Sequence, residues 1–143
     1  MSEPRVIIVD TGPLVALTDK RDHMHQSCNS VLKGLSAYTQ LVTVTSVLTE
    51  AFALLPQNQS CINKLIELLN AIPIKLESLR NQDLPRIEQL MVKYHDLPMD
   101  FADAEIVTIA ENLNITHVFT LDRRDFSVYR PNHTKVFRLL PTR

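Results

Sequence analysis

The chain has 143 residues, enough for one compact domain with a single substantial core, and we expect one domain over residues 1–143. Its 15 basic and 16 acidic residues nearly cancel, so bulk charge does not indicate a strongly basic nucleic-acid binder. Only two glycines occur, Gly12 and Gly34, which excludes a glycine-rich nucleotide-binding loop. No apolar run approaches the roughly 18 residues of a membrane span, so we expect a soluble, cytoplasmic protein.

Strands and helices are expected to alternate along the chain. In chain order, the pattern predicts a strand over 5–9, helices over 14–18 and 23–37, a strand over 41–45, helices over 47–55 and 60–70, a strand over 74–76, helices over 84–94 and 101–113, and strands over 118–121 and 136–139. Asp22 and Ser46 are expected to N-cap the helices that follow them. This alternation favours an α/β fold with a mostly parallel sheet of about five strands and helices on both faces.

Two acidic residues follow predicted buried strands. Asp10 comes directly after the apolar run of residues 6–9, and Asp122 closes the segment 117–121. Open parallel sheets place their ligand sites just past the carboxyl ends of such strands. Each acid also has a purely structural interpretation: Asp10 could start the turn over residues 10–13, and Asp122 could cap the turn after it.

Two further acids lie on predicted helices. At about 100° per residue, Asp103 points along the apolar stripe of the helix over 101–113, whereas Glu105 and Glu111 point away and are expected to face solvent. A buried acid needs a partner, because an unpaired buried charge is very costly. Glu50 lies at the edge of its own helix's apolar stripe and is the weakest candidate when taken alone.

If the fold gathers Asp10, Glu50, Asp103 and Asp122, the four carboxylates repel one another. At about 5 Å and an effective dielectric constant of about 20, each like-charge pair costs roughly 3 kcal/mol. A hard divalent cation such as Mg²⁺ or Mn²⁺ makes such a cluster tolerable, which indicates metal-dependent phosphate chemistry. Asp100 is either the N-cap of its helix or a supplementary ligand, and Asp125 could take the place of Asp122.

Other chemical groups are less informative. Cys28 and Cys61 have no metal-ligand spacing and are expected to be buried thiols. Arg123, Arg124 and Arg130 could position a polyanionic backbone, or could be ordinary solvated charges. No interleaving of aromatic and basic residues indicates base stacking.

Four short segments together resemble a known family. The PIN-domain ribonucleases, and most closely the VapC toxins of bacterial toxin–antitoxin pairs, have similar motifs in the same order; here these are VDTGPLVAL (Val9–Leu17), TEA (Thr49–Ala51), MDFADA (Met99–Ala104) and TLDRRDF (Thr120–Phe126). The resemblance runs from Val6 to about Pro131. Matched residue by residue, it implies that the family's acidic quartet is Asp10, Glu50, Asp103 and Asp122, with Asp10 and Asp103 as the most direct metal ligands.

The resemblance also implies a biological role. It implies a three-layer α/β/α fold and an endoribonuclease that depends on Mg²⁺ or Mn²⁺. It further implies a homodimer that is held inactive by a small antitoxin, whose tail covers the active site. The spacing Thr120-x-Asp122 favours Asp122 over Asp125 as the fourth acid.

Three alternatives stay open. The first is a housekeeping PIN-domain nuclease in RNA maturation, which gene context would distinguish from a toxin. The second is a phosphoryl-transfer protein that uses Asp10, which needs a second early acid beside the nucleophile or a late lysine. Thr11 and Gly12 follow Asp10, and no suitable lysine follows Thr120, so this alternative is disfavoured. The third is a non-catalytic interaction module.

Overall fold

Five strands form one sheet within residues 3–142, the part of the chain that the computed structural model describes. All four strand pairings in this part are parallel, and the order across the sheet is β3-β2-β1-β4-β5. The strands are β1 (Val6–Val9), β2 (Gln40–Val44), β3 (Ile74–Glu77), β4 (His117–Phe119) and β5 (Arg138–Leu140). β1 is central, with β2 on one side and β4 on the other, so the winding direction of the chain reverses there.

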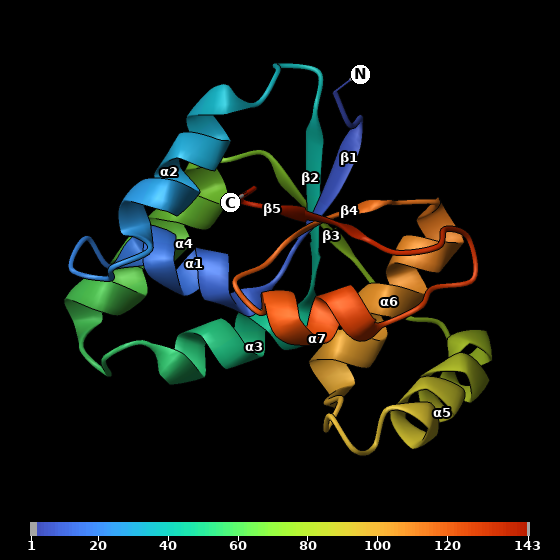
Figure 1. Ribbon diagram of the computed structural model, residues 1–143. Coiled ribbons are helices and arrows are strands. Elements are labelled where there is room, and N and C mark those ends of the chain that lie inside the picture. The colour runs from blue at the N-terminus through green and yellow to red at the C-terminus, as the bar shows by residue number, and fades with distance from the viewer. Residues whose placement is uncertain (1–2, 143) are drawn as a thin grey trace.

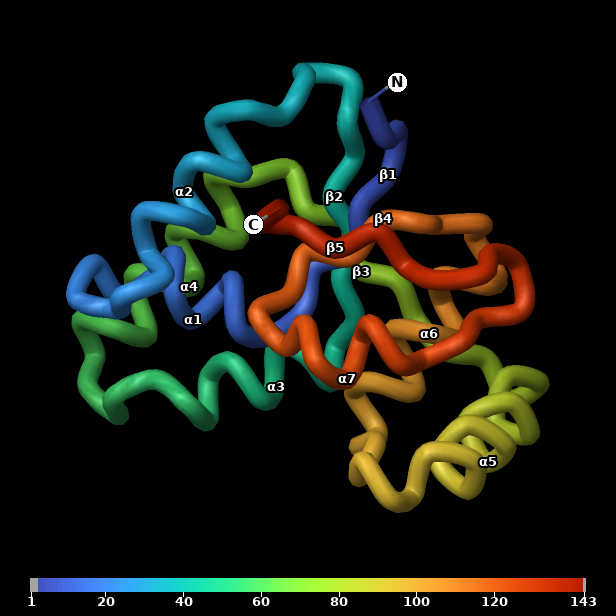
Figure 2. Tube along the Cα trace, in the orientation of Figure 1, coloured from blue at the N-terminus to red at the C-terminus, as the bar shows by residue number. Residues whose placement is uncertain are grey.

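Helices cover both faces of the sheet and give a three-layer α/β/α arrangement (Figure 1). α1, α2 and α4 lie on one side of the sheet, and α5 and α6 lie on the other, as the tube in Figure 2 also shows. α3 contacts both α1 and α6. The helices are α1 (Thr11–Thr18), α2 (His25–Gly34), α3 (Thr45–Leu54), α4 (Gln59–Ala71), the 3-10 turn η1 (Asn81–Asp83), α5 (Leu84–Lys93), α6 (Phe101–Leu113) and α7 (Arg123–Val128).

The predicted alternation of strands and helices is confirmed, with some local corrections. Asp22 does not cap α2, which begins at His25; its Oδ1 instead accepts the backbone N–H of Met24 at 2.8 Å. Ser46 is not a cap either, because the chain turns straight from β2 into α3 and Ser46 already lies within the first turn. Cys28 is buried as expected, whereas Cys61 is only half-buried.

α6 has the boundaries that its sequence predicts. Asp100 caps its start, since Oδ1 accepts the backbone N–H of Asp103 at 2.8 Å. Asn114 ends the helix in the left-handed conformation, with φ of 56°. The predicted cap role of Asp100 is therefore confirmed.

The core lies between the sheet and both helical layers. The central strand supplies Ile7, Ile8 and Val9, which are at most 1% exposed, and the last third of the chain supplies the buried rings of Phe126 and Tyr129. Within residues 3–142, no helix combines the length and the apolar character that a membrane crossing requires.

Candidate active site

The carboxyl ends of β1 and β4 lie side by side and bring two acidic residues together. Val9 pairs with Phe119, and the backbone N–H of Asp10 donates to the Phe119 carbonyl at 2.8 Å. Asp10 directly follows β1, and Asp122 follows β4 closely as the N-cap of α7. The two acids therefore meet at the point where the winding of the sheet reverses, which is the usual ligand position in open α/β sheets.

Two helices, α3 and α6, add further acids. A cavity of about 360 Å³ opens between these elements, and six carboxylates line it: Asp10, Glu50, Asp100, Asp103, Asp122 and Asp125. The four acids of the predicted site thus lie together in space, with both supplementary candidates beside them. Their role as metal ligands stays a prediction.

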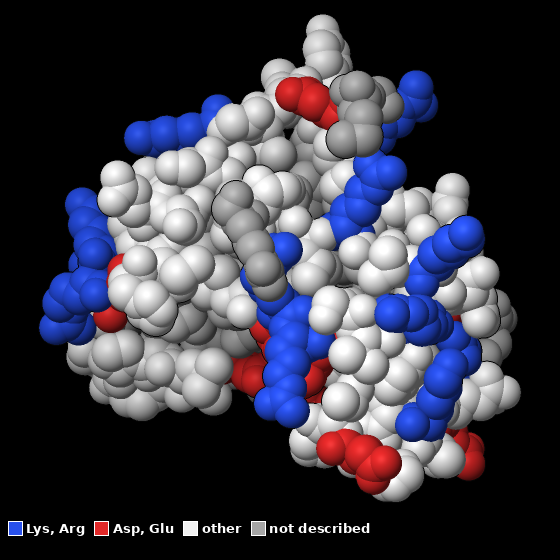
Figure 3. Space-filling view, viewed as in Figure 1, with Lys and Arg blue, Asp and Glu red and all other residues white. Residues whose placement is uncertain are grey.

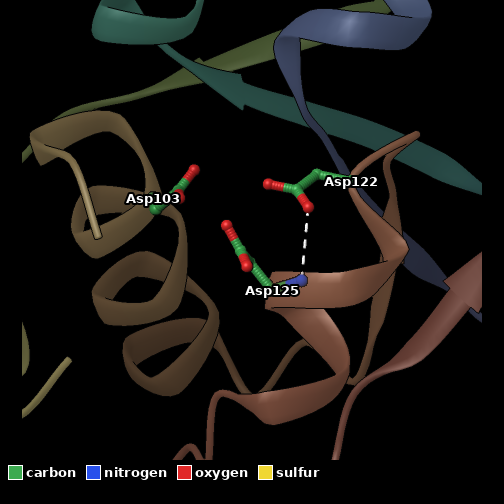
Figure 4. Close-up of side chains that lie close together, drawn as sticks. All are labelled: Asp103, Asp122 and Asp125. Atoms are coloured by element: carbon green, nitrogen blue, oxygen red, sulfur yellow. Dashed lines mark hydrogen bonds between the residues drawn. The ribbon is translucent and has the colours of Figure 1, made fainter. Parts of the chain in front are cut away.

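Three of these carboxylates point toward one another (Figure 4). One oxygen from each of Asp103, Asp122 and Asp125 lies within 4.8 Å of the others. Asp122 also caps α7, because its Oδ1 accepts the backbone N–H of Asp125 at 3.2 Å. The structural interpretation of Asp122 and its place in the cluster are therefore compatible, and Asp125 lies beside Asp122 in the same cluster.

Burial and mutual repulsion perturb these acids. Burial raises the pKa of Asp10 to about 6, and the charges of Glu50 and Asp122 add to the effect. Burial also raises the pKa of Asp103 to about 8, with Asp100 and the other acids contributing. The pKa of Asp122 is raised by burial and by the charge of Asp125. Full ionisation of the cluster is thus unfavourable unless a positive charge is bound.

Hydroxyl groups hold the carboxylates of Asp10 and Asp103. Thr120 Oγ1 donates to Asp10 Oδ2 at 2.7 Å and accepts the backbone N–H of Asp122 at 3.0 Å. Tyr129 donates from its hydroxyl to Asp103 Oδ2 at 2.8 Å. Each bond lowers the pKa of its carboxylate and so partly opposes the effect of burial.

A third hydroxyl holds Glu50, since Thr11 Oγ1 donates to Glu50 Oε2 at 2.9 Å. Neither Thr11 nor Tyr129 was among the predicted site residues. The position of Thr11 directly after Asp10 is a signal that could have indicated its role. Tyr129 lies 26 residues from Asp103 and carries no such signal.

The prediction that Glu105 and Glu111 face solvent is wrong. Glu105 is 6% exposed and accepts a hydrogen bond from Ser46 Oγ at 3.0 Å. Glu111 accepts two hydrogen bonds from the Arg86 guanidinium, both at 2.8 Å. α6 packs against α3 and α5 as well as the sheet, so more than one of its sides is covered.

Basic side chains lie beside the acidic group. Figure 3 shows acidic atoms recessed near the middle of this face, partly behind Lys and Arg side chains. Arg123 donates to the Pro141 carbonyl, and Arg130 donates to the Ser127 carbonyl at 2.6 Å, so both have structural partners. Arg124 is exposed in the first turn of α7.

The donor set fits a hard divalent cation. Carboxylate oxygens are the ligands that Mg²⁺ and Mn²⁺ prefer, and clustered acids with raised pKa values gain most from a bound cation. Among the described residues that line this cavity there is neither His nor Cys, the ligands typical of zinc sites.

Comparisons with known proteins give consistent similarities. No family model matches the chain. Ribonuclease VapC26 of Mycobacterium tuberculosis (strain ATCC 25618 / H37Rv) is 28% identical over 138 residues, which cover 94% of this chain and 100% of that protein.

Two solved structures share the fold. VapC20 of Mycobacterium tuberculosis, described as a sarcin–ricin loop cleaving toxin, matches with a TM-score of 0.70 and 16% identity, over 82% of this chain and 91% of that chain. The structure of VapBC2 from Rickettsia felis, bound to a DNA fragment from the VapBC2 promoter, matches with a TM-score of 0.69 and 14% identity. The match covers 94% of this chain and 98% of that chain.

Proposed function

We propose that this chain, a PIN-domain protein of the VapC type, is the ribonuclease toxin of a toxin–antitoxin pair and hydrolyses RNA phosphodiester bonds. The observation that carries the proposal is the meeting of Asp10, Glu50, Asp103 and Asp122 in one cavity. The similarity to a ribonuclease over that protein's full length supports the same reaction class.

The proposed roles follow the resemblance to the PIN-domain ribonucleases, and the place of these acids in one cavity supports them. Asp10 and Asp103 would hold a Mg²⁺ or Mn²⁺ ion directly, with support from Glu50 and Asp122 and with Asp100 and Asp125 as supplementary ligands. The bound cation would supply Lewis-acid activation of the scissile phosphodiester. The Thr120 hydroxyl holds one oxygen of Asp10, and the Tyr129 hydroxyl holds one oxygen of Asp103. These carboxylates are therefore oriented before substrate binds.

The partners proposed here follow the relatives. VapC20 is described as cleaving the sarcin–ricin loop, which supports an RNA substrate for this chain. The VapBC2 structure from Rickettsia felis supports an antitoxin partner. We infer a cognate antitoxin whose tail covers the acidic cavity, and a homodimer as the active assembly. Gene context tests the toxin role, because a housekeeping nuclease would not lie beside a short antitoxin reading frame.

Cleavage of a panel of tRNA, rRNA and mRNA by the purified protein tests the nuclease activity. We expect cleavage with Mg²⁺, none with EDTA, and none from Asp10→Asn or Asp103→Asn, both with a circular dichroism spectrum like that of the wild type. Glu88→Gln, at an exposed acid on α5, is the matched control and should cleave normally. Retained Mg²⁺-dependent cleavage by the purified Asp10→Asn protein would count against this site.

A further inference from the structure

A second hollow adjoins the acidic cavity. Its volume is about 370 Å³, and it is bounded by residues 100–102 at the start of α6 and by Ser46, Thr49, Glu50 and Ala53 on one side of α3. Asp100 and Glu50 line both spaces. A molecule that extends out of the acidic cavity across this shared wall therefore enters the hollow.

Phe101 supplies the largest apolar surface of this hollow. It is the first residue of α6, directly after Asp100, and its side chain is 44% exposed. The start of α6 is held by the capping bond of Asp100, so the backbone that carries this ring is fixed. An exposed aromatic ring on a fixed backbone, next to a candidate catalytic cavity, has the properties of a binding platform.

The hydroxyl groups on the opposite wall are oriented as acceptors. Ser46 Oγ donates its hydrogen to Glu105 at 3.0 Å, and Thr49 Oγ1 donates its hydrogen to the Thr45 carbonyl at 3.1 Å. Each hydroxyl has two lone pairs and a single hydrogen, so both can still accept. Every RNA base carries at least one N–H group on its Watson–Crick edge that such an oxygen can accept.

We propose that this hollow binds an unpaired nucleobase of the RNA, next to the scissile phosphate, with the base stacked on the Phe101 ring. The inference rests on the proposed nuclease function. A polynucleotide whose phosphate lies among the acids must place the neighbouring nucleoside on an adjoining surface. The carboxylates of Glu50 and Asp100 disfavour a second phosphate in the hollow, whereas a neutral base is tolerated.

Binding of two fluorescent probes tests the base subsite. One probe is a single-stranded RNA hexamer of mixed sequence, and the other is an abasic ribose–phosphate hexamer with the same backbone. Affinities are measured by fluorescence anisotropy in Mg²⁺ buffer, with the length of each probe checked on a denaturing gel. We expect Phe101→Ala to weaken binding of the RNA hexamer by roughly tenfold, the effect of losing one base–aromatic stack, and to leave the abasic probe unchanged.

Two further variants provide controls. Phe101→Tyr keeps the ring and should retain the affinity of the wild type for the RNA hexamer. Leu113→Ala removes an apolar side chain that is 45% exposed at the far end of α6, about 18 Å from Phe101 by helical rise. This matched variant should bind both probes like the wild type.

The outcomes separate this inference from the nuclease proposal. Equal weakening of both probes by Phe101→Ala, or no change with either, overturns the base subsite even if the wild type cleaves RNA. Weaker binding of the RNA hexamer by Phe101→Ala, with unchanged binding of the abasic probe, supports the subsite even if the wild type cleaves no RNA in the panel. In that case the nuclease proposal alone fails. A change of oligomeric state in Phe101→Ala, measured by light scattering, with unchanged preference for the RNA hexamer, assigns the surface to a protein contact and overturns the inference.

Discussion

Replacing Tyr129 with Phe removes one oxygen atom that holds the Asp103 carboxylate. The hydroxyl donates to Asp103 Oδ2 at 2.8 Å, and the Tyr129 side chain is fully buried. The rings of Tyr94 and Phe126 pack edge-on against it, each with a centroid distance of 5.1 Å. Phenylalanine fills the same ring volume, so the variant retains this packing and loses only the hydrogen bond.

The cost of this substitution should depend on pH. Burial raises the pKa of Asp103 to about 8, from an ordinary value of 3.8. Because the folded chain holds this proton more tightly, the resulting stability is fully present below about pH 4 and is lost as the pH rises through about 8. Tyr129 stabilises the ionised form, and a hydrogen bond to a charged group contributes about 1.5–3 kcal/mol. We expect Tyr129→Phe to lose about 2 kcal/mol at pH 9 and less at pH 6.

Urea unfolding of the metal-free protein at both pH values measures this effect. Tyr94→Phe is the matched control, because its hydroxyl accepts the Arg130 backbone N–H at 2.8 Å and its loss should cost the same at both pH values. Calorimetric titration with Mg²⁺ at neutral pH should show roughly tenfold weaker binding by Tyr129→Phe, as is usual when a group that orients a metal ligand is removed. A Tyr129→Phe protein with the wild-type pH dependence and Mg²⁺ affinity would refute this reasoning.

Two other predictions concern the same cluster. Protons compete with a cation at Asp10 and Asp103, whose pKa values are raised to about 6 and 8, so Mg²⁺ should raise the melting temperature more at pH 8.5 than at pH 6 in a thermal shift assay. Equal shifts would contradict this. Thr120→Val removes one buried and one part-buried hydrogen bond of the site and should lower the unfolding free energy, measured by urea unfolding, by about 1–3 kcal/mol. Thr108→Val, which loses only a bond to a carbonyl of its own helix, should cost less; equal costs would contradict the role of Thr120.

The elements with strong local signals were predictable from the sequence. Asp100 and Asn114 mark the two ends of α6, and the apolar run before Asp10 marks β1. The meeting of Asp10 and Asp122 followed from a general rule, since parallel strands present their carboxyl ends at one edge of the sheet. The helical acids Asp103 and Glu50 do not follow from this rule; helical phase indicated Asp103, and the resemblance to the PIN-domain ribonucleases added Glu50. α7 was expected only as a turn, because six residues are too few to show a helical period.

The errors arose where tertiary packing decides the environment. The helical phase of Asp103 was interpreted correctly, but the same argument placed Glu105 and Glu111 in solvent. That argument assumes one buried face, whereas Ser46 from α3 and Arg86 from α5 contact α6 on its other sides. The bond from Tyr129 to Asp103 joins side chains from α6 and from the end of α7, and neither local sequence indicates it.

The bond between Thr120 and Asp10 joins residues that are 110 positions apart. During synthesis, Asp10 and Glu50 leave the ribosome early, but the pocket cannot close until β4 and α7 have also emerged and docked. A nascent chain that stops before residue 117 therefore carries Asp10, Glu50 and Asp103 but lacks Asp122, and has no complete site. If the protein is a toxin, this long-range closure delays its activity until almost the whole polypeptide has been made, and the cell that makes it is protected from incomplete chains.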